Sequence, residues 1–314
     1  MPLTLSGPWH YSLTDDPAFA QPEFDASESP TMHLPQNWFL AGLDHHGVIW
    51  FRRTFRIESA NQQSASQQED NQQLPITNYP ITNYPITHFH TLHFSGIDYF
   101  ADIYLNGHPL GRHEGYFEPF SFDVTGLLNE GENVLAVRVD SPHEPVGLDG
   151  WHMRKRLIKG VLNHHDCRPG GGWLPAGQSY NTGGIWNRVT LLEHGPITIE
   201  TVLLRADLES DPPVLFVEMT VLNRDTATSA EIQCLVSPEN FNSPHEYLSH
   251  HTHEIPSGLS THPFSLPVNS LALWEPWDRG FPHLYKITLN LQSPNYPITQ
   301  SPNYSTSFGI RTVR

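Results

Sequence analysis

The sequence predicts an all-β protein made of two domains, and three observations support this. Apolar and polar residues alternate in short runs, helix-like periodicity is scarce, and the 28 Pro and 22 Gly fall mostly between the runs. A period of two places alternate side chains on one face of a strand. Frequent turn residues between short strands are typical of β-sandwiches. A chain of 314 residues is long enough for two such domains, each with its own core.

The expected strands follow one another along the whole chain. Residues 101–105 alternate, and Asn106-Gly107 directly after them suits the positive φ angles of a type I′ hairpin turn. The run 133–139 is apolar on both faces over most of its length, which predicts a central strand. The alternation recurs over 215–221 and 285–291, so the second half of the chain is also expected to be strands.

A domain boundary is expected near Gly195. Before it, residues 185–192 have the pattern of a closing strand, and residues 197–204 begin a new set of alternating strands. We therefore expect one domain over 1–195 and a second over 196–314. The second holds roughly seven short strands over about a hundred residues, which is the size of an immunoglobulin-like sandwich.

Two segments differ in composition from the expected cores. Residues 59–88 begin rich in Gln, Ser, Asn and Glu and continue as repeats of Pro-Ile-Thr-Asn-Tyr, and related repeats occupy 292–305. Units of five residues are too short for a solenoid, and Pro at every fifth position excludes a central strand. We interpret both segments as mobile loops. Deleting 61–86 should change stability little, because loop-closure entropy varies only logarithmically with length.

Composition argues against several classes of protein. The formal net charge is −16, from 17 basic and 33 acidic residues, and no basic stripe suited to nucleic acid is present. No apolar run approaches the roughly 20 residues of a membrane span. The first residues lack a secretion signal, and the two cysteines fall in different expected domains. The sequence therefore predicts a cytoplasmic protein without disulfides.

Six groups of short strings, in the same order along the chain, resemble glycoside hydrolase family 2. They are 34–38 followed by 47–53; 93–99 with 102–107; 115–125; 131–139; 183–189; and, near the end, 274–277, 282–285 and 308–313. In that family the corresponding strings belong to a sugar-binding domain and to the sandwich that follows it. The resemblance implies a galactose-binding-like jelly-roll β-sandwich over 1–195 and an immunoglobulin-like β-sandwich over 196–314.

The resemblance also implies that the catalytic residues lie outside these two domains. In family 2, the Phe-Gly-Ile-Arg string, here at 308–311, is soon followed by a barrel that supplies an acid/base and a nucleophile glutamate. The sequence stops at Arg314, so we expect no catalytic residues and no hydrolysis by this chain alone. Glu114 and Glu118 fall in a structural stretch of the family match, and we interpret them as solvated or hairpin-supporting.

The candidate binding residues lie in a long loop from about Leu148 to Gly184. In family 2 the loop before the closing jelly-roll strand reaches toward the barrel mouth and can touch the sugar. Trp stacks on pyranose faces, and Asn, Asp, Gln and His match hydroxyl groups. The candidates for contact with carbohydrate or barrel are Trp151, Asn163, His164, His165, Asp166, Trp173, Gln178 and Asn181. The alternative is that these polar groups satisfy the backbone of their own loop.

Metal-capable side chains gather at 163–168 and at His250, His251 and His253. A structural zinc site needs four convergent ligands, but adjacent residues of one strand point apart and the two groups fall in different expected domains. We therefore predict no metal and no cofactor.

Together these inferences predict the non-catalytic carbohydrate-binding and scaffold portion of a family 2 glycoside hydrolase, a family that hydrolyses O-glycosyl bonds. A free-standing carbohydrate-binding module and a partner-docking scaffold are the alternatives. The expected partners are a β-glycoside and, because both family domains pack against the barrel, either a separate barrel polypeptide or a second copy of the chain. Trp151 and Trp173 are the expected anchors of that contact.

Overall fold

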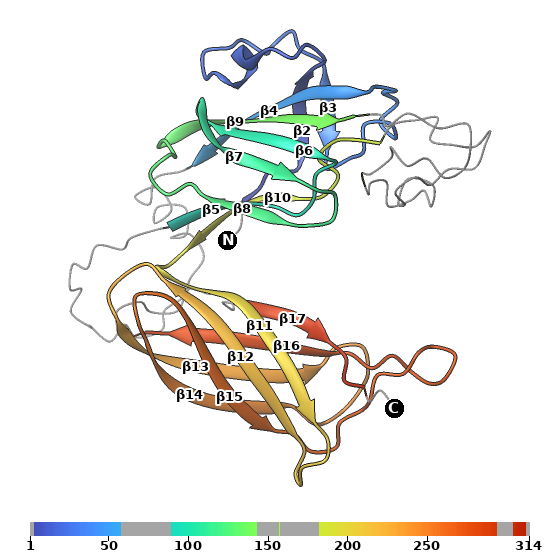
Figure 1. Cartoon of the computed structure of the whole chain (residues 1–314), viewed down its shortest axis with the longest axis vertical. Helices are drawn as coiled ribbons and strands as arrows, with labels where there is room; N and C mark the ends of the chain where they lie inside the picture. The colour runs from blue at the N-terminus through green and yellow to red at the C-terminus, as the bar shows by residue number, and fades with distance from the viewer. Residues whose placement is uncertain (1–2, 58–88, 143–156, 158–181, 294–303, 312–314) are drawn as a thin grey trace, which may run out of the picture. The chain divides into compact units, whose positions relative to one another are not determined.

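The computed structural model describes residues 3–57, 89–142, 157, 182–293 and 304–311 (Figure 1). Contacts within the chain divide it into two compact units, and the boundary along the sequence lies between Glu193 and His194. The repeat-rich segment 59–88 and most of 292–305 lie outside the described residues. Gln292 belongs to strand β16 and Tyr304 begins β17, so these ends of the second repeat segment are strand residues.

The first unit is a sandwich of a six-stranded sheet, in the order β3-β2-β4-β9-β6-β7, and a four-stranded sheet, in the order β1-β10-β5-β8. Its elements are β1 (Leu3–Thr4), β2 (Gly7–Ser12), the 3-10 helix η1 (Pro17–Ala20), β3 (Thr31–Leu34), β4 (Gly47–Ile57), β5 (Phe89–Phe94), β6 (Phe100–Leu105), β7 (His108–Glu114), β8 (Phe120–Asp123), β9 (Gly131–Ser141) and β10 (Val189–His194).

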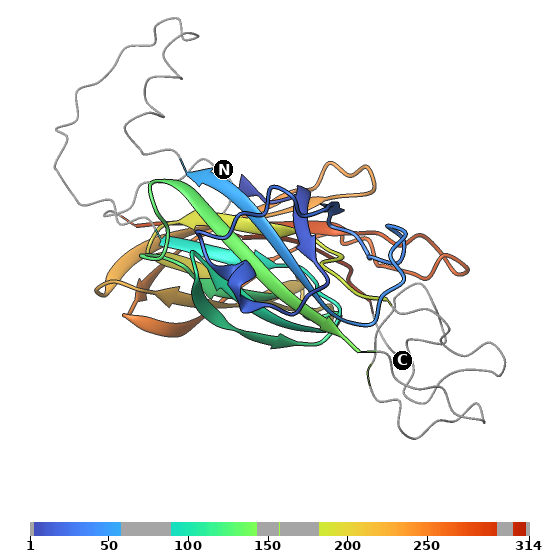
Figure 2. The same ribbon diagram turned by 90° about the horizontal axis from the view of Figure 1, so that it is seen from above.

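The centre of the six-stranded sheet is the long antiparallel pair β4 and β9, in register from Gly47 opposite Ser141 to Ile57 opposite Gly131. Figure 2 shows the two strands side by side. Residues 134–137 of β9 are all buried, so both faces of this strand are covered, and the predicted central strand is confirmed. Asn106-Gly107, with φ angles of 52° and 79°, joins β6 to β7, which confirms the predicted hairpin.

A third layer covers part of the outer face of the six-stranded sheet. The segment around η1 packs Phe19 and Ala20 onto Trp50 of β4 and Ala136 of β9, and Figure 2 shows η1 lying over β9. The Arg52 guanidinium lies beneath this segment, and the residue as a whole is only 4% exposed. This layer explains why Trp50 and Arg52 are buried although they alternate with Phe51, which faces the main core.

The second unit is a sandwich of a three-stranded sheet, in the order β11-β12-β15, and a four-stranded sheet, in the order β14-β13-β16-β17. Its strands are β11 (Ile197–Asp207), β12 (Val214–Asn223), β13 (Thr228–Pro238), β14 (Tyr247–Ile255), β15 (Gly258–Pro267), β16 (Tyr285–Gln292) and β17 (Tyr304–Phe308). Alternate residues of β12, β13 and β16 fill the core between the sheets, including Val217, Met219, Ile232 and Ile287.

The predicted all-β fold is confirmed, because the described residues contain no α-helix and both units are sandwiches. Alternation of period two produces the buried face in each long strand, as in β12, where 215, 217, 219 and 221 are buried. Within the described part of the chain, no helix is long and apolar enough to cross a membrane.

Candidate functional site at the stem of the 143–181 segment

The eight residues predicted to contact sugar or barrel all fall outside the described residues: Trp151, Asn163, His164, His165, Asp166, Trp173, Gln178 and Asn181. The structure does describe where the chain leaves and re-enters this region. Strand β9 ends at Ser141, and the chain is described again from Thr182 to β10. We call the residues that hold these two ends together the loop stem: Gln36, Trp38, Asp98, Ser141 and 182–185.

The returning chain at 183–185 is held between two other segments of the first unit by backbone hydrogen bonds. On one side lies the connection that follows β3, and on the other lies Asp98, which precedes β6. The bonds run from Trp38 N to Gly183 O (2.9 Å), from Gln36 N to Ile185 O (2.9 Å), from Asp98 N to Gly184 O (2.9 Å) and from Gly184 N to Asp98 O (3.1 Å). These bonds fix where the chain re-enters the sandwich.

The Ser141 hydroxyl joins the two ends of the segment. It lies 2.6 Å from the carbonyl oxygen of Thr182 and 3.2 Å from Oδ1 of Asp98, so both acceptors are within reach of its hydrogen bond. Ser141 and Asp98 are completely buried. A charged or polar group at such depth needs hydrogen-bond partners to offset its desolvation. The stem is therefore a built polar contact that brings residues 141 and 182 together at one place on the sandwich.

Close packing of glycine against indole shapes the other side of the stem. A Cβ atom on Gly183 would lie 2.0 Å from Cζ2 of Trp38, whose side chain is completely buried. Gly184 has a φ of 115°, a conformation that favours glycine, and a Cβ there would lie 3.0 Å from the carbonyl oxygen of Gln36. The Gly183-Gly184 pair is thus required by this packing and by the backbone geometry.

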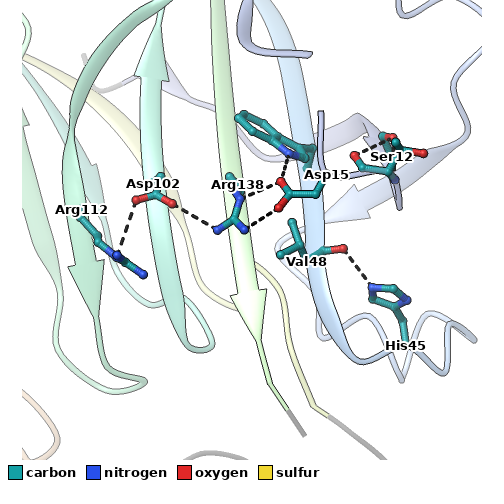
Figure 3. A network of polar contacts seen from close by, with 9 residues as sticks. Ser12, Asp15, His45, Val48, Asp102, Arg112 and Arg138 are labelled. Atoms are coloured by element: carbon teal, nitrogen blue, oxygen red, sulfur yellow. Dashed lines mark hydrogen bonds and ion pairs between the residues drawn. The ribbon is translucent and has the colours of Figure 1, made fainter. Parts of the chain in front are cut away.

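A second network of polar side chains runs across the outer face of the six-stranded sheet (Figure 3). Asp15 accepts hydrogen bonds from Arg138 (2.8 and 2.7 Å) and from the Trp50 indole (2.9 Å). Arg138 also reaches Asp102 (3.3 Å), which pairs with Arg112 at 3.7 Å. The hydrogen bond from Arg138 holds the pKa of Asp15 below the usual value of an aspartate. The same bond holds the pKa of Arg138 above the usual value of an arginine. The ion pair between Asp15 and Arg138 fastens the segment before η1 to the sheet. A carboxylate that is held ionised by an arginine is poorly suited to proton transfer.

We expect Asp15→Asn to lower the free energy of unfolding by about 1 kcal/mol at neutral pH, a modest value because the Asp15 side chain is 47% exposed. Since its pKa is lowered in the folded state, this stabilisation is present above the unfolded value of 3.8 and is lost as pH falls through the folded value. Urea unfolding at pH 7 and at about pH 3 should therefore show a difference from wild type that shrinks in acid. Asp44→Asn removes an exposed carboxylate and is the control; an equal loss there would contradict the role of the Arg138 pair.

Of the two histidine groups considered for zinc, the one at 163–168 lies outside the described residues, and His250, His251 and His253 lie on β14. In the ranges that the structure describes, no three His, Cys, Asp or Glu side chains are arranged to hold a metal ion.

Comparison with known proteins identifies the family of this chain. The family model described as "Glycosyl hydrolase 2 galactose-binding domain-like" matches residues 59–187, and the one described as "Glycosyl hydrolases family 2" matches residues 197–311. The chain belongs to glycosyl hydrolase family 2. The predicted galactose-binding-like and immunoglobulin-like domains of this family 2 chain are thereby confirmed.

The family 2 chain is similar to longer proteins. It is 30% identical over 238 residues to a mannosylglycoprotein endo-beta-mannosidase of Lilium longiflorum, covering 69% of this chain and 23% of that protein. It is 21% identical over 321 residues to a putative beta-glucuronidase of Formosa agariphila, covering 97% and 24%. Its fold matches the beta-D-mannosidase of Dictyoglomus thermophilum with a TM-score of 0.70 and 20% identity, covering 100% of this chain and 36% of that one. The chain thus spans about a quarter of the length of these curated relatives.

Residues 182–184 of the loop stem fall within the loop that the sequence predicted, but its partners Gln36, Trp38, Asp98 and Ser141 were missed by the sequence analysis. Asp98 and Trp38 each fall within a string that carries the family resemblance, and no functional role was predicted for either. One signal was available for Asp98, because an acidic residue between Ile97 and Tyr99 stands in an otherwise apolar setting. Nothing local to Ser141, at the end of β9, distinguishes it from other serines near turns.

Proposed function

We propose that this chain is the non-catalytic carbohydrate-binding and scaffold portion of a family 2 glycoside hydrolase. The observation that carries the proposal is the loop stem, which brings residues 141 and 182 together by buried hydrogen bonds and so anchors the segment richest in candidate sugar-binding side chains. The names of the relatives, an endo-beta-mannosidase and a beta-glucuronidase, favour β-linked mannose or glucuronic acid as the ligand.

The anchored stem matters for binding because a ligand must order whatever segment contacts it. Fixing both ends of the segment on the sandwich reduces the conformational entropy that binding has to overcome. The aromatic and amide side chains of the segment then suit the two surfaces of a sugar, since the ring faces stack on indole and the hydroxyl groups pair with polar atoms.

Titration calorimetry with methyl β-glycosides of mannose, glucuronic acid and galactose tests this function. We expect binding by the wild-type chain and at least about a tenfold loss of affinity in Trp151→Ala/Trp173→Ala, since buried aromatic anchors concentrate binding energy. Trp277→Ala is the matched control, because Trp277 lies in the second unit and is 87% exposed. Absence of binding at millimolar glycoside, or an equal loss in the control, would refute the proposal.

The same preparations should not hydrolyse nitrophenyl β-glycosides above background. Retaining hydrolysis needs two carboxyl groups about 5 Å apart on a rigid frame, which a (β/α)₈ barrel of about 250 residues supplies in many glycosidases. The described residues form four sheets and contain no α-helix, so they do not form such a barrel. Turnover that persists after removal of contaminating host hydrolases would contradict the non-catalytic role.

One observation favours a docking role for the second unit as well. The outer face of the β11-β12-β15 sheet carries Leu203 (64% exposed), Leu259 (68% exposed) and Phe216. A partner that covers such side chains removes their apolar surface from water, which favours association. We infer that this face contributes to association with a separate barrel polypeptide or with a second copy of the chain.

Sedimentation of the chain alone and with a co-expressed family 2 barrel tests the docking role. We expect Leu203→Ser/Leu259→Ser to weaken the association, whereas Leu248→Ser, on β14 of the other sheet and 56% exposed, should leave it unchanged. A chain that stays monomeric at high concentration and ignores the barrel would rule this role out.

A further inference from the structure

Strands β14 and β15 form one open side of the second sandwich. Each is the terminal strand of its own sheet, and residues 256 and 257 alone connect them, so the chain passes from one sheet to the other at this side. Figure 1 shows the two strands running next to each other. Because neither strand has a further hydrogen-bonded neighbour on this side among the described strands, the side chains between them must close the core.

Three histidines occupy that position. His251 and His253 lie opposite the buried residues Ile232 and Ala230 of β13, and His262 lies opposite the buried Met219 of β12, so all three face inward. The ring centroids of His253 and His262 are 5.3 Å apart, and those of His251 and His253 are 6.4 Å apart. We call His251, His253 and His262 the imidazole cluster.

The cluster packs as an apolar group with two short polar contacts. The His251 ring lies 4.2 Å from the ring of Phe264, centroid to centroid, and His262 is only 7% exposed. Nε2 of His251 lies 3.0 Å from the Ser249 hydroxyl, and Nε2 of His262 lies 2.7 Å from that of Ser260. A neutral imidazole satisfies such a contact as donor or acceptor, so uncharged rings fit this environment.

Within the described ranges, no carboxylate of the packed strands faces the rings, so charged rings would lack a counter-ion there. The acidic residues of the packed strands are Glu218 on β12, Glu231 on β13 and Glu254 on β14, and each occupies an outward-facing, exposed position. Glu231 is engaged at 3.2 Å by His250, which also faces outward. The inward-facing titratable group of β13 is Cys234, and burial raises the pKa of its thiol to about 12, so it stays neutral.

We propose that the imidazole cluster is an acid-sensitive latch, which holds β14 against β15 in its neutral form and releases this side of the sandwich when His251 and His262 are protonated. Release exposes the inward face of β15, including Phe264, and the backbone groups of two terminal strands. The immunoglobulin-like unit would then present a different surface in mildly acidic surroundings.

The direction of the effect follows from burial and mutual repulsion. Burial and the neighbouring His253 lower the pKa of His262, and burial, His253 and His250 lower the pKa of His251. The open state therefore binds protons more readily than the closed one. The stability of the closed state relative to the open state is fully present above the ordinary histidine pKa of 6.5. It is lost as pH falls below 6.5 toward the lower pKa values of the closed state.

Hydrogen exchange of the full chain, followed by mass spectrometry at about pH 7.5 and about pH 5.5, tests the latch. After correction for intrinsic exchange rates, we expect the opening constant of peptides from 247–267 to rise roughly tenfold in acid. Peptides from 131–141 of β9, in the first unit, are the internal reference and should not change. Buffers containing a chelator exclude an effect of adventitious metal on the imidazoles.

Two variants separate the latch from general acid sensitivity. His251→Phe/His262→Phe should keep the closed strands and abolish the pH dependence, while His250→Gln, on the outward face of the same strand, should keep it. Should the double variant fail to fold by circular dichroism, His253→Gln alone should reduce the pH dependence. Equal protection of 247–267 at both pH values in wild type, or an undiminished acid effect in the cluster variants, would overturn the proposal.

Discussion

Gly183→Ala should lower the midpoint of thermal unfolding of the first unit by roughly 10 °C. The added Cβ would lie 2.0 Å from the Trp38 ring, which is completely buried and cannot swing into solvent. Backbone movement is also resisted, because Gly183 O accepts the hydrogen bond from Trp38 N. Such overpacking costs about 3 kcal/mol at a site that cannot relax, and differential scanning calorimetry measures the shift.

Two further variants make this prediction specific. Gly195→Ala is the matched control, because a Cβ at Gly195 meets nothing within 4 Å, and its midpoint should stay within about 1 °C of wild type. In a Trp38→Leu background, Gly183→Ala should cost much less than in wild type, since the ring that it strikes is gone. Strict additivity of the two substitutions would show that the contact with Trp38 is not the cause.

Arg52→Met should lower the free energy of unfolding by about 3 kcal/mol. Nη1 of Arg52 donates to the carbonyl oxygens of Phe19 (2.9 Å) and Gln21 (2.8 Å), and Nη2 donates to those of Pro22 (3.0 Å) and Phe24 (3.2 Å). Methionine fills similar space but donates no hydrogen bond, so the segment around η1 loses the group that fastens it to the sheet. Urea unfolding measures the loss, and limited proteolysis at residues 13–30 should become faster.

Arg56→Met is the control for Arg52, because Arg56 lies on the same strand with its side chain exposed, and it should change stability by less than about 0.5 kcal/mol. Arg52→Lys should recover only part of the loss, since an ammonium group cannot reproduce the planar fork that reaches four carbonyls. A wild-type rate of proteolysis in Arg52→Met would show that the segment is held mainly by Phe19 and Ala20.

Local sequence was sufficient to predict the class of fold. Alternation over 215–221 produces the buried face of β12, and the apolar run 133–139 becomes the doubly covered strand β9. Asn106-Gly107 turns β6 into β7 because both residues accept positive φ. These features depend on the period of the chain and on the conformational preferences of single residues, so they can be recognised without knowing what packs against them.

The loop stem and the imidazole cluster could be recognised only in the tertiary structure. Asp98, Ser141 and Thr182 come from three separate parts of the chain, and only the packing of the first sandwich brings them within hydrogen-bond distance.

Sequence spacing made His250, His251 and His253 equal candidates for a metal site. The pairing of β13 with β14 turns His250 outward and the other two inward, and the crossing from one sheet to the other brings His262 to them. Contacts between distant segments are set by strand register and by how sheets stack, and neither is encoded in the short-range pattern that reveals a strand.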